Sequence, residues 1–121
     1  MATQNATLSD PQGDGSVITA KWVLTNTDDG APFYAPQWAD RSVQVGITSD
    51  TFGTGTIVIE GSNDGTTWTQ LRNPQGVSLA FTAAGLNQIL ENTTYIRPRA
   101  SAAVTSVTII LCARRATPMR T

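Results

Sequence analysis

Few side chains of this protein have the chemistry of a catalytic centre. The 121 residues include no histidine and a single cysteine, Cys112. Histidine is the commonest general base, the usual partner of a serine or cysteine nucleophile, and the commonest transition-metal ligand. Its absence removes most hydrolase chemistry, and one cysteine cannot build a structural zinc site. The sequence therefore predicts no catalytic, cofactor-binding or metal-binding residues.

Carboxylates are the remaining candidates for acid–base catalysis or cation binding. Asp28 adjoins Asp29, and Asp10 lies near Asp14, but neither pair has the ligand spacing of a calcium loop. A glycosidase requires two carboxylates that face each other across a cleft. The alternation around Glu60 instead predicts that this carboxylate lies on the outer face of a strand. We therefore predict that the protein is not an enzyme.

Charge is distributed unevenly along the chain, although the net charge is only −1. Residues 1–91 carry three basic and nine acidic side chains, whereas residues 92–121 carry five arginines and no acid. The five are Arg97, Arg99, Arg114, Arg115 and Arg120. These arginines either bind an acidic partner, a sister copy or phosphate, or they neutralise acids within the same fold. Direct nucleic-acid binding is not expected, because the chain has one lysine and no basic run with interleaved aromatic residues.

The elements that position these residues are predicted to be strands. Nineteen threonines suit a pleated, half-buried surface, and ten glycines and six prolines provide turns. Apolar and polar residues alternate with a period of two in most segments. The predicted strands cover residues 16–25, 42–48, 56–62, 67–71, 76–82, 94–100 and 104–113, and residues 83–91 fit either a strand or a helical turn. We therefore predict an all-β fold, a single antiparallel β-sandwich of jelly-roll type with seven or eight short strands.

Polar, turn-rich segments are expected to flank this sandwich. The predicted domain covers residues 16–113, between an N-terminal arm at residues 1–15 and a basic tail at residues 114–121. Both arms are expected to extend from the domain and contact partners. No apolar run is long enough to span a membrane, and residues 1–10 lack the features of a secretory signal.

The large apolar residues divide into a predicted core and a set of loop aromatics. Trp22, Trp68 and Phe81 are the expected core between the sheets, and Cys112 is expected to be buried and inert. The loop aromatics are Phe33, Tyr34, Trp38 and Phe52. A planar, solvent-facing cluster of these four would favour glycan binding, whereas their burial would favour a protein that works by assembly.

Two segments resemble a known family of β-sandwiches. Residues 59–71, with the sequence IEGSNDGTTWTQL, and residues 95–99, YIRPR, are similar to the central part of discoidin-type domains. In that family a strand enters a Ser-Asn-Asp-Gly turn, a tryptophan follows, and a later aromatic-Ile/Leu-Arg strand completes the sheet. The resemblance implies a β-sandwich and binding of a glycan or a lipid.

The phrase GSNDGTTW at residues 61–68, in a small, threonine-rich chain without histidine, is also similar to small virion proteins of tailed bacteriophages. Such proteins decorate or cement capsids, or complete the neck and tail, often as oligomers. This resemblance implies a capsid decoration protein, made in the host cytoplasm, that binds the major capsid protein and copies of itself in the virion. The alternatives are a carbohydrate-binding or adhesin-like module and a head–tail or neck component.

Overall fold

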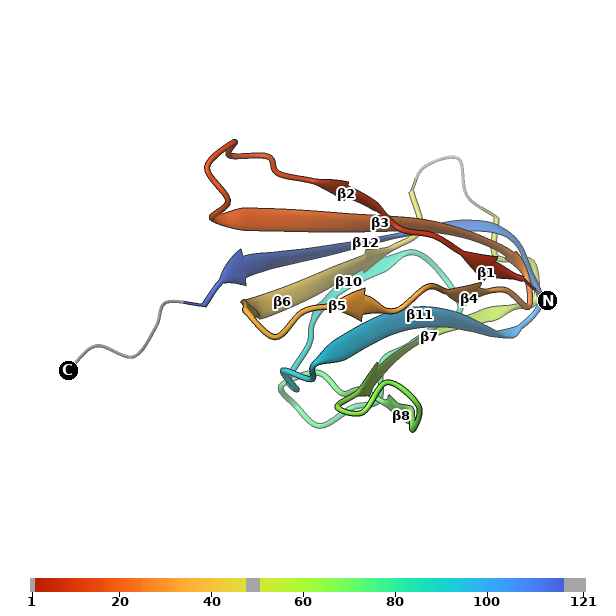
Figure 1. Cartoon of the computed structure of the whole chain (residues 1–121). Coiled ribbons are helices and arrows are strands. Elements are labelled where there is room, and N and C mark those ends of the chain that lie inside the picture. Colours follow the sequence, from red (N-terminus) through yellow and green to blue (C-terminus); the bar gives the residue numbers. More distant parts are fainter. Residues whose placement is uncertain (1, 48–50, 117–121) are drawn as a thin grey trace.

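Two β-sheets face each other across one apolar core (Figure 1). A computed structural model describes residues 2–47 and 51–116 of the chain. These residues form twelve strands and no helix, so the prediction of an all-β sandwich is confirmed. The strands outnumber the seven or eight predicted, because several segments read as loops contain strands of two or three residues. The described residues contain no helix that could cross a membrane.

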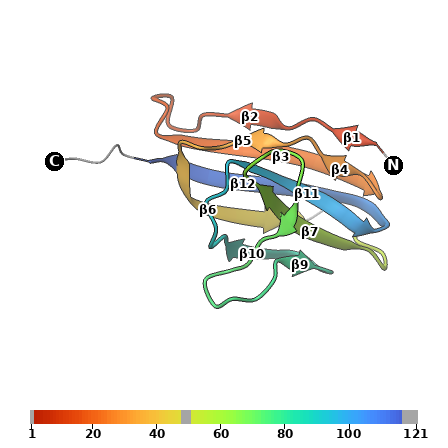
Figure 2. The same ribbon diagram turned by 60° about the horizontal axis from the view of Figure 1, so that its bottom comes forward.

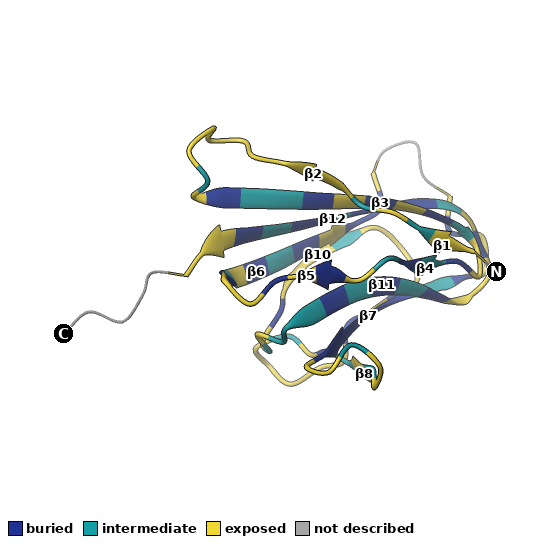
Figure 3. Ribbon diagram, in the orientation of Figure 1, coloured by how far each residue is buried: buried dark blue, intermediate teal, exposed yellow. Residues whose placement is uncertain are grey.

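The first sheet is built around two long central strands. Its described strands are β1 (Thr3–Gln4), β4 (Asp29–Gly30), β5 (Phe33–Tyr34), β7 (Thr56–Ser62), β8 (Thr69–Gln70), β9 (Ala80–Phe81) and β11 (Tyr95–Ala102). Strand β11 pairs with β7 on one side and with β4 and β5 on the other, and β1 joins β4 in parallel. Figure 3 shows that β7 is buried along almost its whole length.

The second sheet is antiparallel throughout. Its described strands are β2 (Thr7–Ser9), β3 (Val17–Asn26), β6 (Trp38–Val45), β10 (Gly85–Gln88) and β12 (Val104–Arg115). They lie in the order β10-β6-β12-β3-β2. The segment that fitted either a strand or a helical turn therefore contains a strand, β10, which completes one edge of this sheet.

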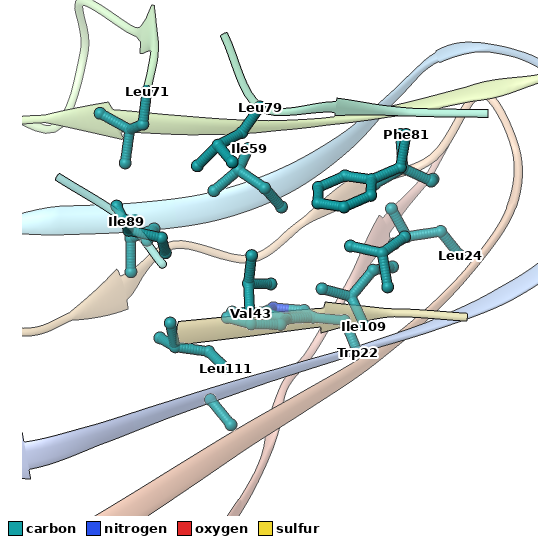
Figure 4. Close-up of a cluster of buried hydrophobic side chains, with 14 of the residues drawn as sticks. Trp22, Leu24, Val43, Ile59, Leu71, Leu79, Phe81, Ile89, Ile109 and Leu111 are labelled. Carbon is teal, nitrogen blue, oxygen red and sulfur yellow. The ribbon is translucent and has the colours of Figure 1, made fainter. Parts of the chain in front are cut away.

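The inward-facing residues of both sheets fill the core (Figure 4). Trp22 is 1% exposed, and its Nε1 donates a 3.0 Å hydrogen bond to the carbonyl oxygen of Ala31. Phe81 is also buried, so the core prediction is confirmed for these two residues. It is wrong for Trp68, which lies only half-buried outside the core cluster.

The N-terminal segment is part of the fold: the prediction that it extends from the domain is wrong for residues 3–9, which contain two strands that join the sheets. Strand β2 pairs with β3, while the backbone N–H groups of Asp29 and Ala31 donate to the carbonyl oxygens of Ala2 and Gln4. Strands this short contain too few residues to show a period of two. At the other end, β12 includes Arg114 and Arg115, which were predicted to belong to the tail at residues 114–121. Residues 117–121 of that tail lie outside the described residues.

Pro98 lies inside the first sheet, on β11, between β7 and the short strands β4 and β5. The N–H of Ala100 donates to the backbone carbonyl oxygen of Asp28 at 3.0 Å. Alternate residues of β11, including Pro98, therefore direct their backbone nitrogen toward β4 and β5. The register shifts by one residue between the Arg99–Asp29 pair and the Ile96–Phe33 pair, so Pro98 lies at an irregularity of the ladder, where proline is tolerated. Its ring packs on Gly30, where an added Cβ would lie 2.5 Å from a ring carbon of Pro98.

Candidate functional site

Glu60 is the centre of a charged network on the outer face of the first sheet. Its Oε1 accepts a 3.1 Å hydrogen bond from Nε of Arg97, and its Oε2 accepts one of 3.0 Å from Nε of Arg99. Nη1 of Arg97 lies 4.0 Å from Oδ2 of Asp29. The register explains this arrangement, because Arg97 lies directly opposite Glu60 in the β7–β11 pair. Arg97 and Arg99 therefore neutralise acids of their own fold, one of the two roles the sequence left open.

A tight turn places Trp68 over this network. The guanidinium carbon of Arg97 lies 4.2 Å from the centre of the Trp68 ring, a cation–π contact. The turn between β7 and Trp68 is held by Asp64, whose Oδ1 accepts 2.8 Å hydrogen bonds from the N–H groups of Thr66 and Thr67. These backbone donors hold the pKa of the Asp64 carboxyl well below its usual range. Gly65 takes the left-handed conformation, with φ of 80°, as the Asn-Asp-Gly sequence predicts.

The four loop aromatics do not form one exposed cluster. Phe33, Trp38 and Phe52 are buried in the core, whereas Tyr34 is 62% exposed. Tyr34 packs at a tilt on Tyr95, with 5.3 Å between the ring centroids. The described residues therefore do not include the planar, solvent-facing cluster of these four side chains that glycan binding would need.

The C-terminal arginines lie on the other sheet and form a separate group. Arg115 donates from Nε to the carbonyl oxygen of Gly15 at 2.9 Å, and its guanidinium lies 5.0 Å from the centre of the Trp38 ring. Arg114 is exposed at the end of β12, opposite Val17. The five predicted arginines therefore do not make one patch: Arg97 and Arg99 belong to the first sheet, and Arg114 and Arg115 to the second. Arg120 lies outside the described residues.

A buried arginine, Arg41, was not predicted as a functional or structural residue. It is 1% exposed, and it donates to the carbonyl oxygens of Ala35 and Thr93 at 2.7 Å and of Trp38 at 3.0 Å. Burial lowers the pKa of its guanidinium. The alternation that places Val43 and Val45 inward also places Arg41 inward, so the burial of Arg41 could have been predicted from the sequence.

The described side chains offer little for chemistry. No group of three or more histidine, cysteine, aspartate or glutamate side chains in residues 2–47 and 51–116 could hold a metal ion. Cys112 is half-buried on the outer face of the second sheet, opposite Thr19 and Ser42, rather than in the core. The candidate binding surfaces are then the Tyr34–Tyr95 pair beside the Glu60 network, and the end of β12 that carries Arg114 and Arg115.

Comparison with known proteins gives a fold and no family. No protein-family profile and no curated protein sequence matches the chain. Among solved structures, the SPBc2 prophage-derived protein YomS matches with a TM-score of 0.57 and 11% identity, over 78% of this chain and 93% of that one. The vicilin from Solanum melongena matches with a TM-score of 0.53 and 14% identity, over 93% of this chain and 28% of that one. A recombinant oxalate oxidase in complex with glycolate matches with a TM-score of 0.51 and 13% identity, over 94% and 53% of the two chains. These likenesses show a shared β-sandwich fold.

Proposed function

We propose that the protein is a non-enzymatic structural protein of a phage particle, a capsid decoration protein that binds the capsid lattice in the virion. The observation that carries the proposal is the match to the prophage-derived protein, which covers 93% of that protein's chain. This chain therefore resembles that protein as a whole, whereas it resembles only 28% of the vicilin and 53% of the oxalate oxidase.

The side chains support binding to a protein rather than chemistry. The charges of the first sheet pair with one another around Glu60, and three of the four loop aromatics are used in the core. The side chain of Arg114 is exposed, and it makes no hydrogen bond or ion pair within residues 2–47 and 51–116. We propose that this end of β12 contacts an acidic surface of the major capsid protein or of a sister copy.

The test is whether the chain is part of a particle. Antibodies against the purified protein should label the capsids of virus particles purified from the organism that encodes it. Arg114→Glu should reduce incorporation in a salt-dependent way, whereas Lys21→Glu, a matched charge reversal elsewhere on the second sheet, should not. Absence of the protein from particles would contradict the proposal, and label confined to necks or tails would favour a head–tail component.

A carbohydrate-binding module is the second candidate, because Tyr34 is 62% exposed and packs on Tyr95. Exposed aromatic rings provide flat apolar surface with a polar tip. Binding of the protein to a glycan array, lost in Tyr34→Ala and kept in Arg114→Glu, would favour this candidate over decoration.

A further inference from the structure

Strand β10 is an exposed edge of the second sheet. Among the described residues it pairs with β6 alone. Figure 2 shows it at the bottom of the view, on the side of the molecule away from β2. Leu86 in this strand is 69% exposed, more than the other exposed large hydrophobic residues of the described chain.

The hydrogen-bonding groups of β10 can be assigned to one side or the other. The N–H of Ile89 donates to the carbonyl oxygen of Arg41 at 3.0 Å, so Ile89 is in a hydrogen-bonded pair with β6. In an antiparallel ladder such pairs alternate with pairs whose N–H and C=O groups point outward. Asn87 therefore bonds to β6, while Leu86 and Gln88 direct their backbone N–H and C=O groups away from the sheet. The N–H of Leu90, two residues after Gln88, also points away from β6, and it donates to the carbonyl oxygen of Arg72 at 2.8 Å.

Strand β10 has only four residues, but it contains no charged residue, no proline and no bulge. Natural edge strands are protected by charged residues, proline, bulges or very short length. No charged residue occurs between Arg72 and Glu91. At the opposite edge, β2 has three residues, is followed by Asp10 and Pro11, and has Thr7 opposite Lys21.

We propose that β10 pairs with β10 of a second copy of this chain, in antiparallel orientation about a two-fold axis. A strand edge is self-complementary under that symmetry, because each outward donor meets an outward acceptor. In the register that uses both outward residues, Leu86 of each copy lies opposite Gln88 of the other, which gives four backbone hydrogen bonds. The side chains of Leu86 and Gln88 are on the outer face of the sheet. The two exposed Leu86 side chains therefore lie near the axis, and no like charges meet. The two second sheets then form one continuous sheet. Dimerisation through β10 requires only the fold, whether or not the protein is part of a virion.

The proposal is tested by measuring the mass of the purified full chain in solution and the hydrogen exchange of its backbone amides. Light scattering and native mass spectrometry should give twice the monomer mass of 12.8 kDa. The double variant Leu86→Lys with Gln88→Lys places like charges across the axis and should raise the dissociation constant of the dimer by about tenfold or more. In the wild type the Leu86 and Gln88 N–H groups should exchange slowly with solvent, and in the double variant quickly.

Val23→Lys is the matched control, because Val23 is an exposed aliphatic residue on the outer face of the same sheet, on β3. It should remain dimeric, and circular dichroism should show that both variants are folded. A wild-type mass of 12.8 kDa at every concentration would overturn the proposal. Persistence of the dimer in the double variant, or its equal loss in Val23→Lys, would also overturn it.

Discussion

Oδ2 of Asp28 accepts a 2.9 Å hydrogen bond from Nε2 of Gln4, and this contact joins the N-terminal segment to the loop after β3. The N–H and the hydroxyl of Thr25 also donate to Oδ2, and the N–H of Ala2 donates to Oδ1, each at 3.1 Å. Burial of Asp28 raises the pKa of its carboxyl, but these four hydrogen bonds outweigh burial and the net shift is downward. The ionised carboxylate therefore stabilises the folded state.

Asp28→Asn should lower the free energy of unfolding at neutral pH by about 1–3 kcal/mol, because the amide cannot accept all four hydrogen bonds. A carboxyl with a lowered folded-state pKa stabilises the fold above its unfolded pKa, near 3.8, and the contribution is lost as the pH falls through the folded-state value. The difference between wild type and variant, measured by urea denaturation, should therefore shrink in acid. A difference that is constant with pH would contradict this role of the charge.

Glu60→Gln should destabilise the protein by about 2–3 kcal/mol, because it leaves Arg97 and Arg99 without their shared counter-charge. The control is the exposed pair of Arg72 and Glu91, 2.7 Å apart. Arg72→Ala should cost less than about 1 kcal/mol, because solvent screens exposed pairs. Equal losses in the two variants, measured by denaturant unfolding, would show that the Glu60 network is no stronger than a surface pair.

Gly65→Val should cost on the order of 1 kcal/mol or more, because a β-branched residue is strained at positive φ. The added Cβ would also lie 3.4 Å from the Tyr95 ring. Gly65→Asn is the control, since asparagine tolerates this conformation, and thermal melting should rank it between wild type and the valine variant. If the two variants melt together, the cost comes from the Tyr95 contact and not from the backbone.

Trp22→Ala should destabilise the sandwich by about 3–5 kcal/mol, because it empties a core site and leaves the Ala31 carbonyl without its donor. Trp68→Ala should cost clearly less, since Trp68 is half-buried and packs on Arg97 rather than in the core. Denaturant unfolding of both variants checks the difference. Comparable losses would mean that the outer face of the first sheet is as important for stability as the core.

The contrast between the two tryptophans shows what the sequence could predict. Trp22 lies within a long alternating segment, where a period of two fixes the face of each residue. Trp68 follows a turn, so its direction depends on the hydrogen bonds of Asp64 and not on a period. The pairing of Glu60 with Arg97 and Arg99 depends on the register of β7 against β11, and alternation within one strand does not determine register. The short strand β1 depends likewise on a distant partner, β4, whereas β2 pairs with the next strand but contains too few residues to show a period.

Arg41→Lys tests whether the buried guanidinium acts through its charge or through its geometry. The three carbonyl oxygens that it binds come from two segments of the chain: those of Ala35 and Trp38 from the turn that leads into β6, and that of Thr93 from the loop before β11. The planar fork of arginine reaches them together, whereas the single ammonium of lysine cannot occupy the same positions. Arg41→Lys and Arg41→Met should therefore both cost about 2–3 kcal/mol, since buried carbonyls lose their donors in each. A lysine variant that unfolds at the wild-type denaturant concentration, beside a destabilised methionine variant, would show that a positive charge at this position is sufficient.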